Sequence, residues 1–196
     1  MNALLQEMQI FAKDNNVPII KPSAAEILCR TVAEQKSQRI LEIGTAIGYS
    51  ALLMAQNAAD NVEIITLELS AGRIATARNF INKSPYKKNI TIIAGDAEES
   101  LHKLSGKFDF VFIDAAKGQY IKYLQAVLPL LTDAGIIAAD NVMFRGYVES
   151  SEKPPRRYKT IVKRLREYLQ EINELNELET IIYHENDGLA ISKKRI

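Results

Sequence analysis

Short runs of apolar and β-branched residues recur along the chain, with helical patterns between them. Five of these runs are almost continuously apolar, as strands buried on both faces of a sheet are, and they lie at 39–43, 62–68, 89–95, 108–114 and 135–140. The segments with helical periodicity lie at about 48–58, 70–83, 97–104 and 118–131. Because parallel strands need a helix-length crossover, this alternation predicts an α/β fold with a mostly parallel sheet and helices on both faces.

The two ends of the chain depart from this alternation. Two helices are expected at 2–14 and 22–36, before the first strand. Near the other end, a long helix at about 155–174 precedes strand patterns at 178–184 and 187–194, where Asp187-Gly188 supplies turn chemistry. This arrangement predicts an antiparallel C-terminal hairpin at one edge of the sheet. We expect a single domain over 1–196, with N-terminal helices in 1–36 and the sheet core in 37–196.

Composition sets the broad class of the protein. Its 196 residues are 47% hydrophobic and 25% charged, and the net charge is +1, as in an ordinary globular domain without a strong overall field. The single cysteine, Cys29, excludes an intrachain disulfide and favours a reducing compartment. No apolar run approaches the roughly 20 residues of a membrane span. The N-terminal segment contains Glu7 and Asp14, unlike a signal peptide, so we expect a cytoplasmic protein.

The stretch "RILEIGTAIGYSALLMA" (39–55) predicts a strand, a glycine turn and a helix. In open α/β sheets, ligands bind at the carboxyl ends of the strands. The turn lacks the dinucleotide fingerprint, because Ala46 and Tyr49 stand where glycines are needed, and it has no P-loop lysine. Glu42 would repel a pyrophosphate but suits a cationic amine, while Gly44 and Gly48 allow close approach of a ligand.

Acidic residues also end the next two strands. Glu68 stands where an acidic residue binds the ribose of a nucleoside. Asp96 and the Ala97 backbone can hold an adenine, and the hydroxyl of Thr45 or Ser50 can hold a ligand carboxylate. Amine, ribose and adenine together describe S-adenosylmethionine. The alternative is that the glycines serve only a tight turn.

A second group of oxygen-bearing side chains follows strands 108–114 and 135–140, which end at Asp114 and at Asp140-Asn141. If these strands are neighbours, about 4.8 Å apart, two carboxylates and an amide oxygen surround one point. Asp140 and Asn141 can converge only if the chain turns there, since successive strand residues point to opposite faces. Three hard oxygen ligands favour Mg²⁺. The alternative is an ordinary turn.

Lys117 lies three residues after Asp114. A lysine that faces a divalent cation has its charged form disfavoured and can act as a general base. The alternative is an ordinary solvated lysine.

Several motifs together resemble the class I S-adenosylmethionine-dependent O-methyltransferases of the catechol and caffeoyl-CoA O-methyltransferase family. They are "LEIGTAIGYSA", "TLE", "GDA", "FIDAAKGQY" and "DNVMFRG", and the resemblance extends over nearly the whole chain. It implies a Rossmann-like sheet of seven strands in the order 3214576, a homodimer, and a metal, Mg²⁺ with Mn²⁺ as the alternative. It places the metal on Asp114, Asp140 and Asn141, and catalysis on Lys117 with Asp114. With Asp96 added from the strand-end argument, the cofactor-binding set is Ile20, Glu42, Gly44, Ser50, Glu68, Asp96, Ala97 and Asp114.

The acceptor is suggested by "KPPRRYKTIVKRLR" (153–166), which has seven basic residues and no acidic one. A helical wheel places an apolar face on Tyr158, Ile161, Val162, Leu165 and Leu169. The opposite, basic side holds Arg156, Lys159, Lys163 and Arg166, flanked by Arg157 and Arg164. With Arg145 near the predicted metal ligands, this stripe suits a phosphate backbone, and the alternative is a solvated face.

A closer resemblance concerns the bacterial tRNA 5-hydroxyuridine methyltransferases, which form 5-methoxyuridine at the wobble position. It rests on "KPSAAEIL", "DAAKGQY" and "DNVMFRG". The chain has no Trp and no aromatic-rich insertion to enclose a small ring. We therefore expect the tRNA anticodon loop as acceptor, ahead of a small catechol or hydroxycinnamoyl compound. A non-enzymatic S-adenosylmethionine-binding module is a more distant alternative.

Overall fold

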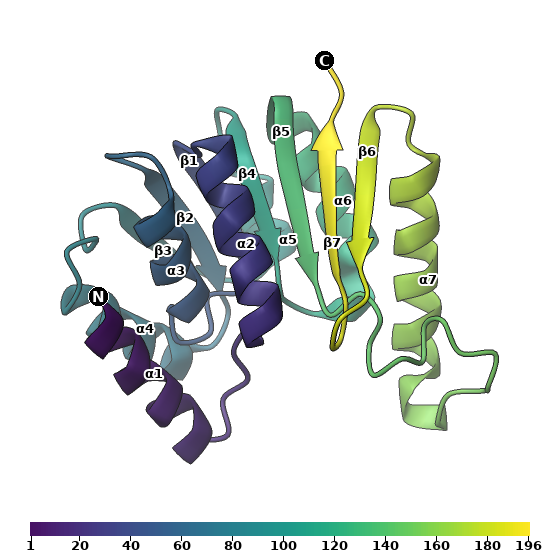
Figure 1. The fold of residues 1–196 in the computed structure, drawn as a ribbon, viewed down its shortest axis with the longest axis horizontal. Coiled ribbons are helices and arrows are strands. Elements are labelled where there is room, and N and C mark those ends of the chain that lie inside the picture. Colours follow the sequence, from purple (N-terminus) through teal and green to yellow (C-terminus); the bar gives the residue numbers. More distant parts are fainter. The chain divides into compact units, whose positions relative to one another are not determined.

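The computed structural model describes residues 1–196 and contains a seven-stranded sheet in the order β3-β2-β1-β4-β5-β7-β6 (Figure 1). The predicted α/β class, strand order and antiparallel C-terminal hairpin are confirmed. The chain divides into two compact units, Met1–Leu104 and Ser105–Ile196, which are described in turn. The single-domain boundary of 1–196 stays a prediction. None of the helices has the length and apolar character that crossing a membrane requires.

The first unit consists of three parallel strands and five helices. Its elements are α1 (Asn2–Asp14), α2 (Pro22–Gln35), β1 (Arg39–Ile43), α3 (Tyr49–Asn57), β2 (Glu63–Glu68), α4 (Ala71–Asn82), β3 (Ile90–Ala94) and α5 (Ala97–Leu101). The strands pair in parallel, with Ile43 opposite Leu67 and Glu68 opposite Ala94. This register brings the carboxyl ends of the three strands to one edge of the unit.

The second unit contains the other four strands. Its elements are β4 (Phe108–Ile113), a 3-10 turn (Lys117–Gln119), α6 (Tyr120–Val127), a second 3-10 turn (Leu128–Leu130), β5 (Leu131–Asp140), a third (Arg156–Tyr158), α7 (Lys159–Glu174), β6 (Leu178–Tyr183) and β7 (Leu189–Lys194). β5 pairs in parallel with β4 and antiparallel with β7, which forms the hairpin with β6. β4 and β5 form the core of this unit, and Phe108, Phe110 and Phe112 are completely buried.

Three boundaries differ from the sequence-based prediction. The helix expected over 118–131 is confined to α6, because Pro129 removes a backbone donor and the chain continues as a 3-10 turn. β5 then begins at Leu131 instead of residue 135. The hairpin loop is longer than two residues, since β6 ends at Tyr183 and β7 begins at Leu189. Of the expected Asp187-Gly188 turn pair, Gly188 has a positive φ of 78°, and the other positive φ in the loop is that of Asn186, 56°.

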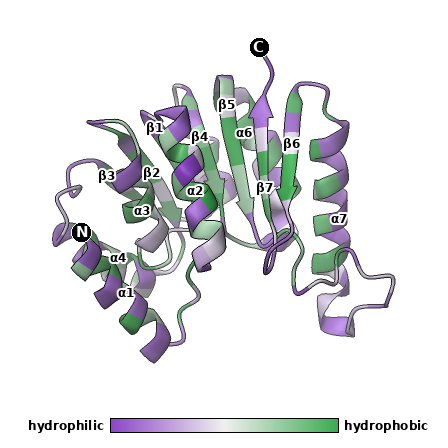
Figure 2. Cartoon of the chain, viewed as in Figure 1, coloured by the Kyte–Doolittle hydropathy of each residue, from purple (hydrophilic) through white to green (hydrophobic).

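The buried face of α7 is also displaced from the predicted one. Val162 and Leu165 are buried as expected, but the face continues through Tyr168 and Ile172 instead of Leu169. The Tyr168 ring packs edge-on against Tyr120 of α6, with centroids 5.4 Å apart, so contact with α6 selects this face. The two faces of α7 differ clearly in hydropathy (Figure 2).

Candidate cofactor and metal sites

The turn between β1 and α3 is tightly bound to the end of β2. Gly44 (φ 107°) and Gly48 (φ 84°) both adopt backbone conformations that favour glycine. The N–H groups of Gly44 and Thr45 donate to the Leu67 carbonyl oxygen at 3.0 and 3.1 Å. A Cβ on Gly48 would lie 3.2 Å from Ile81 Cδ1, so this position also needs a small residue for packing.

Glu42 is a completely buried carboxylate with its own hydroxyl donors. Ser50 Oγ donates to Glu42 Oε1 and Thr66 Oγ1 donates to Glu42 Oε2, both at 2.5 Å. The Thr45 hydroxyl is buried and lies 2.6 Å from Thr66 Oγ1. Thr45 therefore supports the Glu42 network instead of facing a ligand, which differs from the expected role. The place of Ser50 in the cofactor set stays a prediction.

Glu68, at the end of β2, organises the backbone around it. Its Oε2 accepts from Ala46 N at 2.9 Å, and its Oε1 accepts from Leu69 N and Ser70 N at 3.0 and 2.9 Å. A carboxylate has about four lone-pair sites, so these bonds leave one acceptor position on Oε2. The arrangement holds the glycine turn in place and is compatible with the predicted ribose contact.

Asp96 caps α5, because its Oδ1 accepts from Glu98 N and Glu99 N at 2.9 and 3.2 Å. Sequence reasoning missed this capping role, although an aspartate before a helix is a common cap. Ala97 is the first residue of that helix, and Ile20 is buried in the segment that joins α1 to α2. Parallel pairing brings the strand ends that carry Glu42, Glu68 and Asp96 to one edge, as expected; their cofactor contacts stay predictions.

The predicted metal ligands lie in the second unit. Ile113 pairs with Ala139, so Asp114 and Asp140 come at the same level of two adjacent strands. Asn141 has a positive φ of 57°, which is the turn that the metal hypothesis required. Asp140 is buried, and its Oδ1 accepts from Asn141 N at 2.7 Å.

The electrostatics of this pair suit a divalent cation. Burial raises the pKa of Asp140 to about 7, and the negative charge of Asp114 also raises it, whereas the Asn141 N–H and Lys117 lower it. Two neighbouring carboxylates repel each other, and a cation with oxygen ligands such as Mg²⁺ would offset that repulsion. No cluster of three or more His, Cys, Asp or Glu side chains is positioned to hold a metal, so the site would depend on Asn141 as its third ligand.

Lys117 faces this carboxylate pair. Its Nζ lies 2.9 Å from Asp114 Oδ1, and the side chain is only 19% exposed. It also lies over the ring of Tyr120, 5.9 Å from the centroid. The structure therefore favours a site lysine over a solvated one; its role as a base stays a prediction.

Sequence reasoning missed Tyr120. Its buried hydroxyl lies 2.9 Å from the Asp140 carbonyl oxygen and 3.3 Å from the Ile113 carbonyl oxygen. It therefore joins the ends of the two strands that carry Asp114 and Asp140. The available signal was a tyrosine close to a polar loop, since a buried tyrosine hydroxyl usually finds a partner.

The loop after Asn141 is held by the hairpin tip. Met143 N donates to the Asp187 carbonyl oxygen at 2.8 Å, and Arg145 N donates to Asp187 Oδ1 at 2.9 Å. Phe144 and Arg145 both have positive φ angles, 39° and 58°, which are unfavourable for these residue types. These bonds with Asp187 hold a strained segment beside the predicted metal ligands.

Not all cations of the predicted basic helix are free to bind a ligand from solution. Arg166 donates to the carbonyl oxygens of Tyr147, Val148 and Ser150 at 2.8 to 3.0 Å. It therefore fastens the loop after the predicted metal ligands to α7, a role that the helical wheel did not predict.

With this geometry in place, comparison with known proteins identifies the family. The family model described as O-methyltransferase matches residues 2–195. The chain belongs to the O-methyltransferase family. A catechol O-methyltransferase from Niastella koreensis is 34% identical over 141 residues, 69% of this chain and 64% of the relative. A caffeoyl-CoA O-methyltransferase from Stellaria longipes is 29% identical over 137 residues, 67% of this chain and 57% of the relative.

A solved structure supports the assignment of the fold. The SAH-bound methyltransferase from Podospora anserina has a TM-score of 0.89 and 28% identity to this O-methyltransferase family member, and the match covers 98% of this chain and 88% of that chain. The matches to the first curated relatives span only 58% to 64% of their length.

Proposed function

We propose that this protein transfers the methyl group of S-adenosylmethionine to a hydroxyl of an acceptor that carries two adjacent oxygen atoms. The observation that carries the proposal is the placement of Asp114 and Asp140 at the ends of two adjacent strands, with Lys117 Nζ 2.9 Å from Asp114. Asp114, Asp140 and Asn141 would hold the metal, Mg²⁺ or Mn²⁺. When bound, such a cation supplies charge that lowers the pKa of the acceptor hydroxyl.

Lys117 is the proposed general base. Its Nζ accepts the proton of the acceptor hydroxyl, after which the acceptor oxygen bonds to the methyl carbon as the carbon–sulfur bond breaks. Tyr120 keeps the ends of β4 and β5 together while this occurs, through its bond to the Asp140 carbonyl. Fixing two reactants in the correct geometry can contribute roughly 7–11 kcal/mol to lowering the barrier.

Within the first unit, the proposed cofactor contacts are the following. Glu42 attracts the cationic amine, and its orientation is fixed by Ser50 and Thr66. Glu68 accepts from the ribose, Asp96 and the Ala97 backbone hold the adenine, and Gly44 permits close approach. Ile20 supplies an apolar contact. The SAH-bound structural neighbour supports this proposal, because SAH is the cofactor after loss of its methyl group.

The relatives favour a small acceptor with adjacent oxygens, of the catechol or hydroxycinnamoyl kind. The exposed cations on and beside α7 favour a second candidate, 5-hydroxyuridine in the tRNA anticodon loop, whose hydroxyl lies beside a carbonyl oxygen. In either case we propose a cytoplasmic homodimer.

The test incubates the protein with S-adenosylmethionine, Mg²⁺ and either catechol or tRNA that contains 5-hydroxyuridine, and detects methylated product by mass spectrometry. We expect EDTA to abolish the reaction and Lys117→Met to reduce kcat by about 10²–10⁴-fold, the usual contribution of a general base. Full activity in EDTA, or in Lys117→Met, would overturn the corresponding part of the mechanism.

A further inference from the structure

The tip of the β6–β7 hairpin is bonded to the loop that begins with the predicted ligand Asn141. β5 and β7 pair regularly up to the end of β5. Beyond that point, Val142 N donates to the Gly188 carbonyl oxygen at 3.2 Å. Met143 N donates to the Asp187 carbonyl oxygen at 2.8 Å. Two backbone acceptors of the hairpin tip therefore fix the start of the loop directly after the last strand pair.

Asn141 begins a turn whose exit is conformationally unfavourable. Phe144 N donates to the Asn141 carbonyl oxygen at 3.2 Å, which closes a four-residue turn. The φ angles of Asn141, Phe144 and Arg145 are all positive, at 57°, 39° and 58°. Asparagine adopts such angles readily, whereas phenylalanine and arginine seldom do. Because strain of this kind persists only where the surrounding structure fixes it, the exit of the turn needs a contact that holds Phe144 and Arg145.

The Asp187 carboxylate provides that contact. Its Oδ1 accepts a hydrogen bond from Arg145 N at 2.9 Å. Unlike the two backbone acceptors of the hairpin tip, this acceptor depends on the identity of the residue. Asp187 is itself held close to the loop, because a Cβ on the neighbouring Gly188 would collide with the Met143 side chain. The carboxylate therefore fixes the exit of the turn whose first residue is Asn141.

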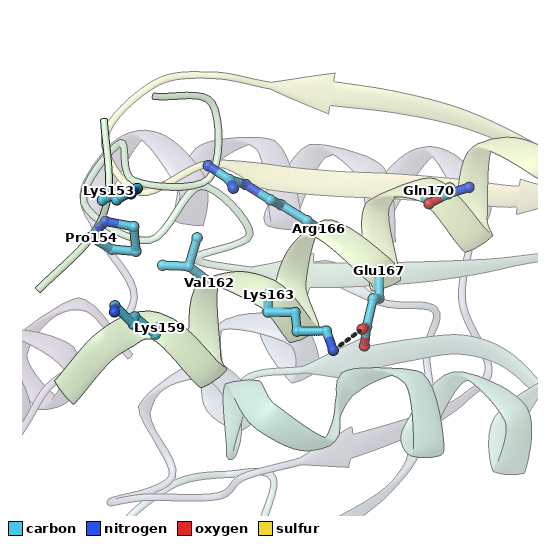
Figure 3. Close-up of a pocket in the computed structure, with 8 residues that line it drawn as sticks. All are labelled: Lys153, Pro154, Lys159, Val162, Lys163, Arg166, Glu167 and Gln170. Carbon is cyan, nitrogen blue, oxygen red and sulfur yellow. Dashed lines mark ion pairs between the residues drawn. The ribbon is translucent and has the colours of Figure 1, made fainter. Parts of the chain in front are cut away.

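The later part of the loop has a separate fastening. A groove of about 440 Å³ runs along α7 (the α7 groove), and its lining includes Lys153, Lys159, Val162, Lys163 and Arg166 (Figure 3). The Arg166 side chain points away from the helix and donates to three carbonyl oxygens within 147–150. These bonds do not involve Asp187. Loss of the Asp187 acceptor should therefore release the turn at Asn141 and leave 147–150 in place.

We propose that Asp187 is a positioning residue for Asn141. Its carboxylate holds the turn over 141–145 in one conformation before any metal binds. A ligand that is already ordered loses less conformational freedom on binding, so this contact raises the affinity for Mg²⁺. The ordering of the turn does not depend on the proposed function, whereas the gain in Mg²⁺ affinity rests on it, since metal ligation by Asn141 belongs to that function.

The experiment compares Asp187→Ala with Asp187→Asn in the full chain. The asparagine keeps an oxygen that can accept from Arg145 N, and the alanine does not. Glu185→Ala is the control, because it removes an exposed carboxylate from the same hairpin tip. One readout is amide hydrogen exchange over 142–145 in metal-free protein, followed by mass spectrometry. The other is the dissociation constant for Mg²⁺ alone, from isothermal titration calorimetry.

We expect Asp187→Ala to accelerate exchange over 142–145 at least about tenfold, as local opening becomes easier, with little change over 147–150. Its Mg²⁺ affinity should fall by about 10–100-fold, the usual effect of removing an outer partner of a metal ligand. Asp187→Asn should retain slow exchange and most of the Mg²⁺ affinity. Glu185→Ala should match the wild type in both readouts.

Unchanged exchange in Asp187→Ala would overturn the proposal. It would also be overturned if Asp187→Asn were as impaired as Asp187→Ala, because charge and not the hydrogen bond would then be the cause. Faster exchange throughout the second unit with unchanged Mg²⁺ affinity would assign Asp187 a purely structural role, which contradicts the proposal.

Two further outcomes are distinguishable. Wild-type protein that binds no Mg²⁺, but whose turn still depends on Asp187 for slow exchange, would overturn the metal site of the proposed function and support the ordering role. If circular dichroism shows that Asp187→Ala is unfolded, Asp187→Ser repeats the test, because its shorter side chain withdraws the acceptor from Arg145 N.

Discussion

The Tyr120 hydroxyl lies 2.9 Å from the carbonyl oxygen of Asp140, so a side chain at the start of α6 supports the backbone at the end of β5. The same hydroxyl lies 3.3 Å from the Ile113 carbonyl oxygen, one residue before Asp114. The hydroxyl therefore bridges the two strand ends that carry Asp114 and Asp140.

Replacing Tyr120 with phenylalanine is expected to lower the free energy of unfolding by about 1 kcal/mol, because a buried carbonyl loses its donor. Urea unfolding of metal-free protein measures this change. Tyr168→Phe is the matched control, since the Tyr168 hydroxyl is buried but has no hydrogen-bond partner. Removing that hydroxyl should leave stability unchanged or raise it by up to about 1 kcal/mol. Equal destabilisation by both changes would contradict the role of Tyr120.

Asp140→Ala is expected to abolish detectable Mg²⁺ binding in isothermal titration calorimetry and to reduce any Mg²⁺-dependent methylation at least about 100-fold, since it removes a proposed direct ligand. Asp133→Ala is the control, because Asp133 lies on the same strand with a side chain that is 84% exposed. Mg²⁺ affinity that is unchanged in Asp140→Ala would exclude this site.

Gly188→Ala is expected to destabilise the protein by about 2–4 kcal/mol, because it combines a positive φ with a collision against Met143. Gly146→Ala separates the two effects, since Gly146 has a similar φ of 75° but no atom within 4 Å of the added Cβ. The control should therefore cost only about 1–2 kcal/mol, the conformational part. Thermal unfolding of both variants decides the matter, and equal costs would show that the Met143 contact is unimportant.

Glu68→Gln is expected to weaken S-adenosylmethionine binding by about tenfold or more, as measured by calorimetry. The glutamine amide would direct N–H groups toward the backbone donors of Ala46 or of Leu69 and Ser70, which removes acceptors and displaces the glycine turn. Glu63→Gln, at the exposed start of the same strand, changes only a surface ion pair with Arg39 and should have little effect. A similar loss of affinity in both variants would argue against a local role for Glu68.

The elements that the sequence predicted well are those with a local cause. The apolar strands β4 and β5 are recognisable because burial on both faces requires continuous hydrophobicity, and the oxygen-bearing residues at their ends follow directly. A turn at Asn141 was predictable because a shared metal site would require the Asp140 and Asn141 side chains to converge, and Asn141 has a positive φ of 57°.

The missed features depend on distant parts of the chain. Tyr120 reaches the Asp140 carbonyl only because α6 packs where the ends of β4 and β5 lie side by side. No local sequence pattern encodes that packing. The helical wheel places Arg166 among solvated cations. It instead donates hydrogen bonds to three carbonyl groups of a loop with no regular structure, which the sequence pattern does not reveal. The Thr45 hydroxyl is hydrogen-bonded to the Thr66 hydroxyl, and Thr66 lies on β2, more than twenty residues away in the sequence.

The division of the chain into two compact units has a consequence for how this enzyme family can diversify. All predicted methyl-donor residues except Asp114 lie in Met1–Leu104, whereas the predicted metal ligands, the strained loop and the α7 groove lie in Ser105–Ile196. Acceptor choice can therefore change through substitutions in one half while the donor half is conserved. A chimera that exchanges Ser105–Ile196 between two family members should inherit the acceptor preference of the second half.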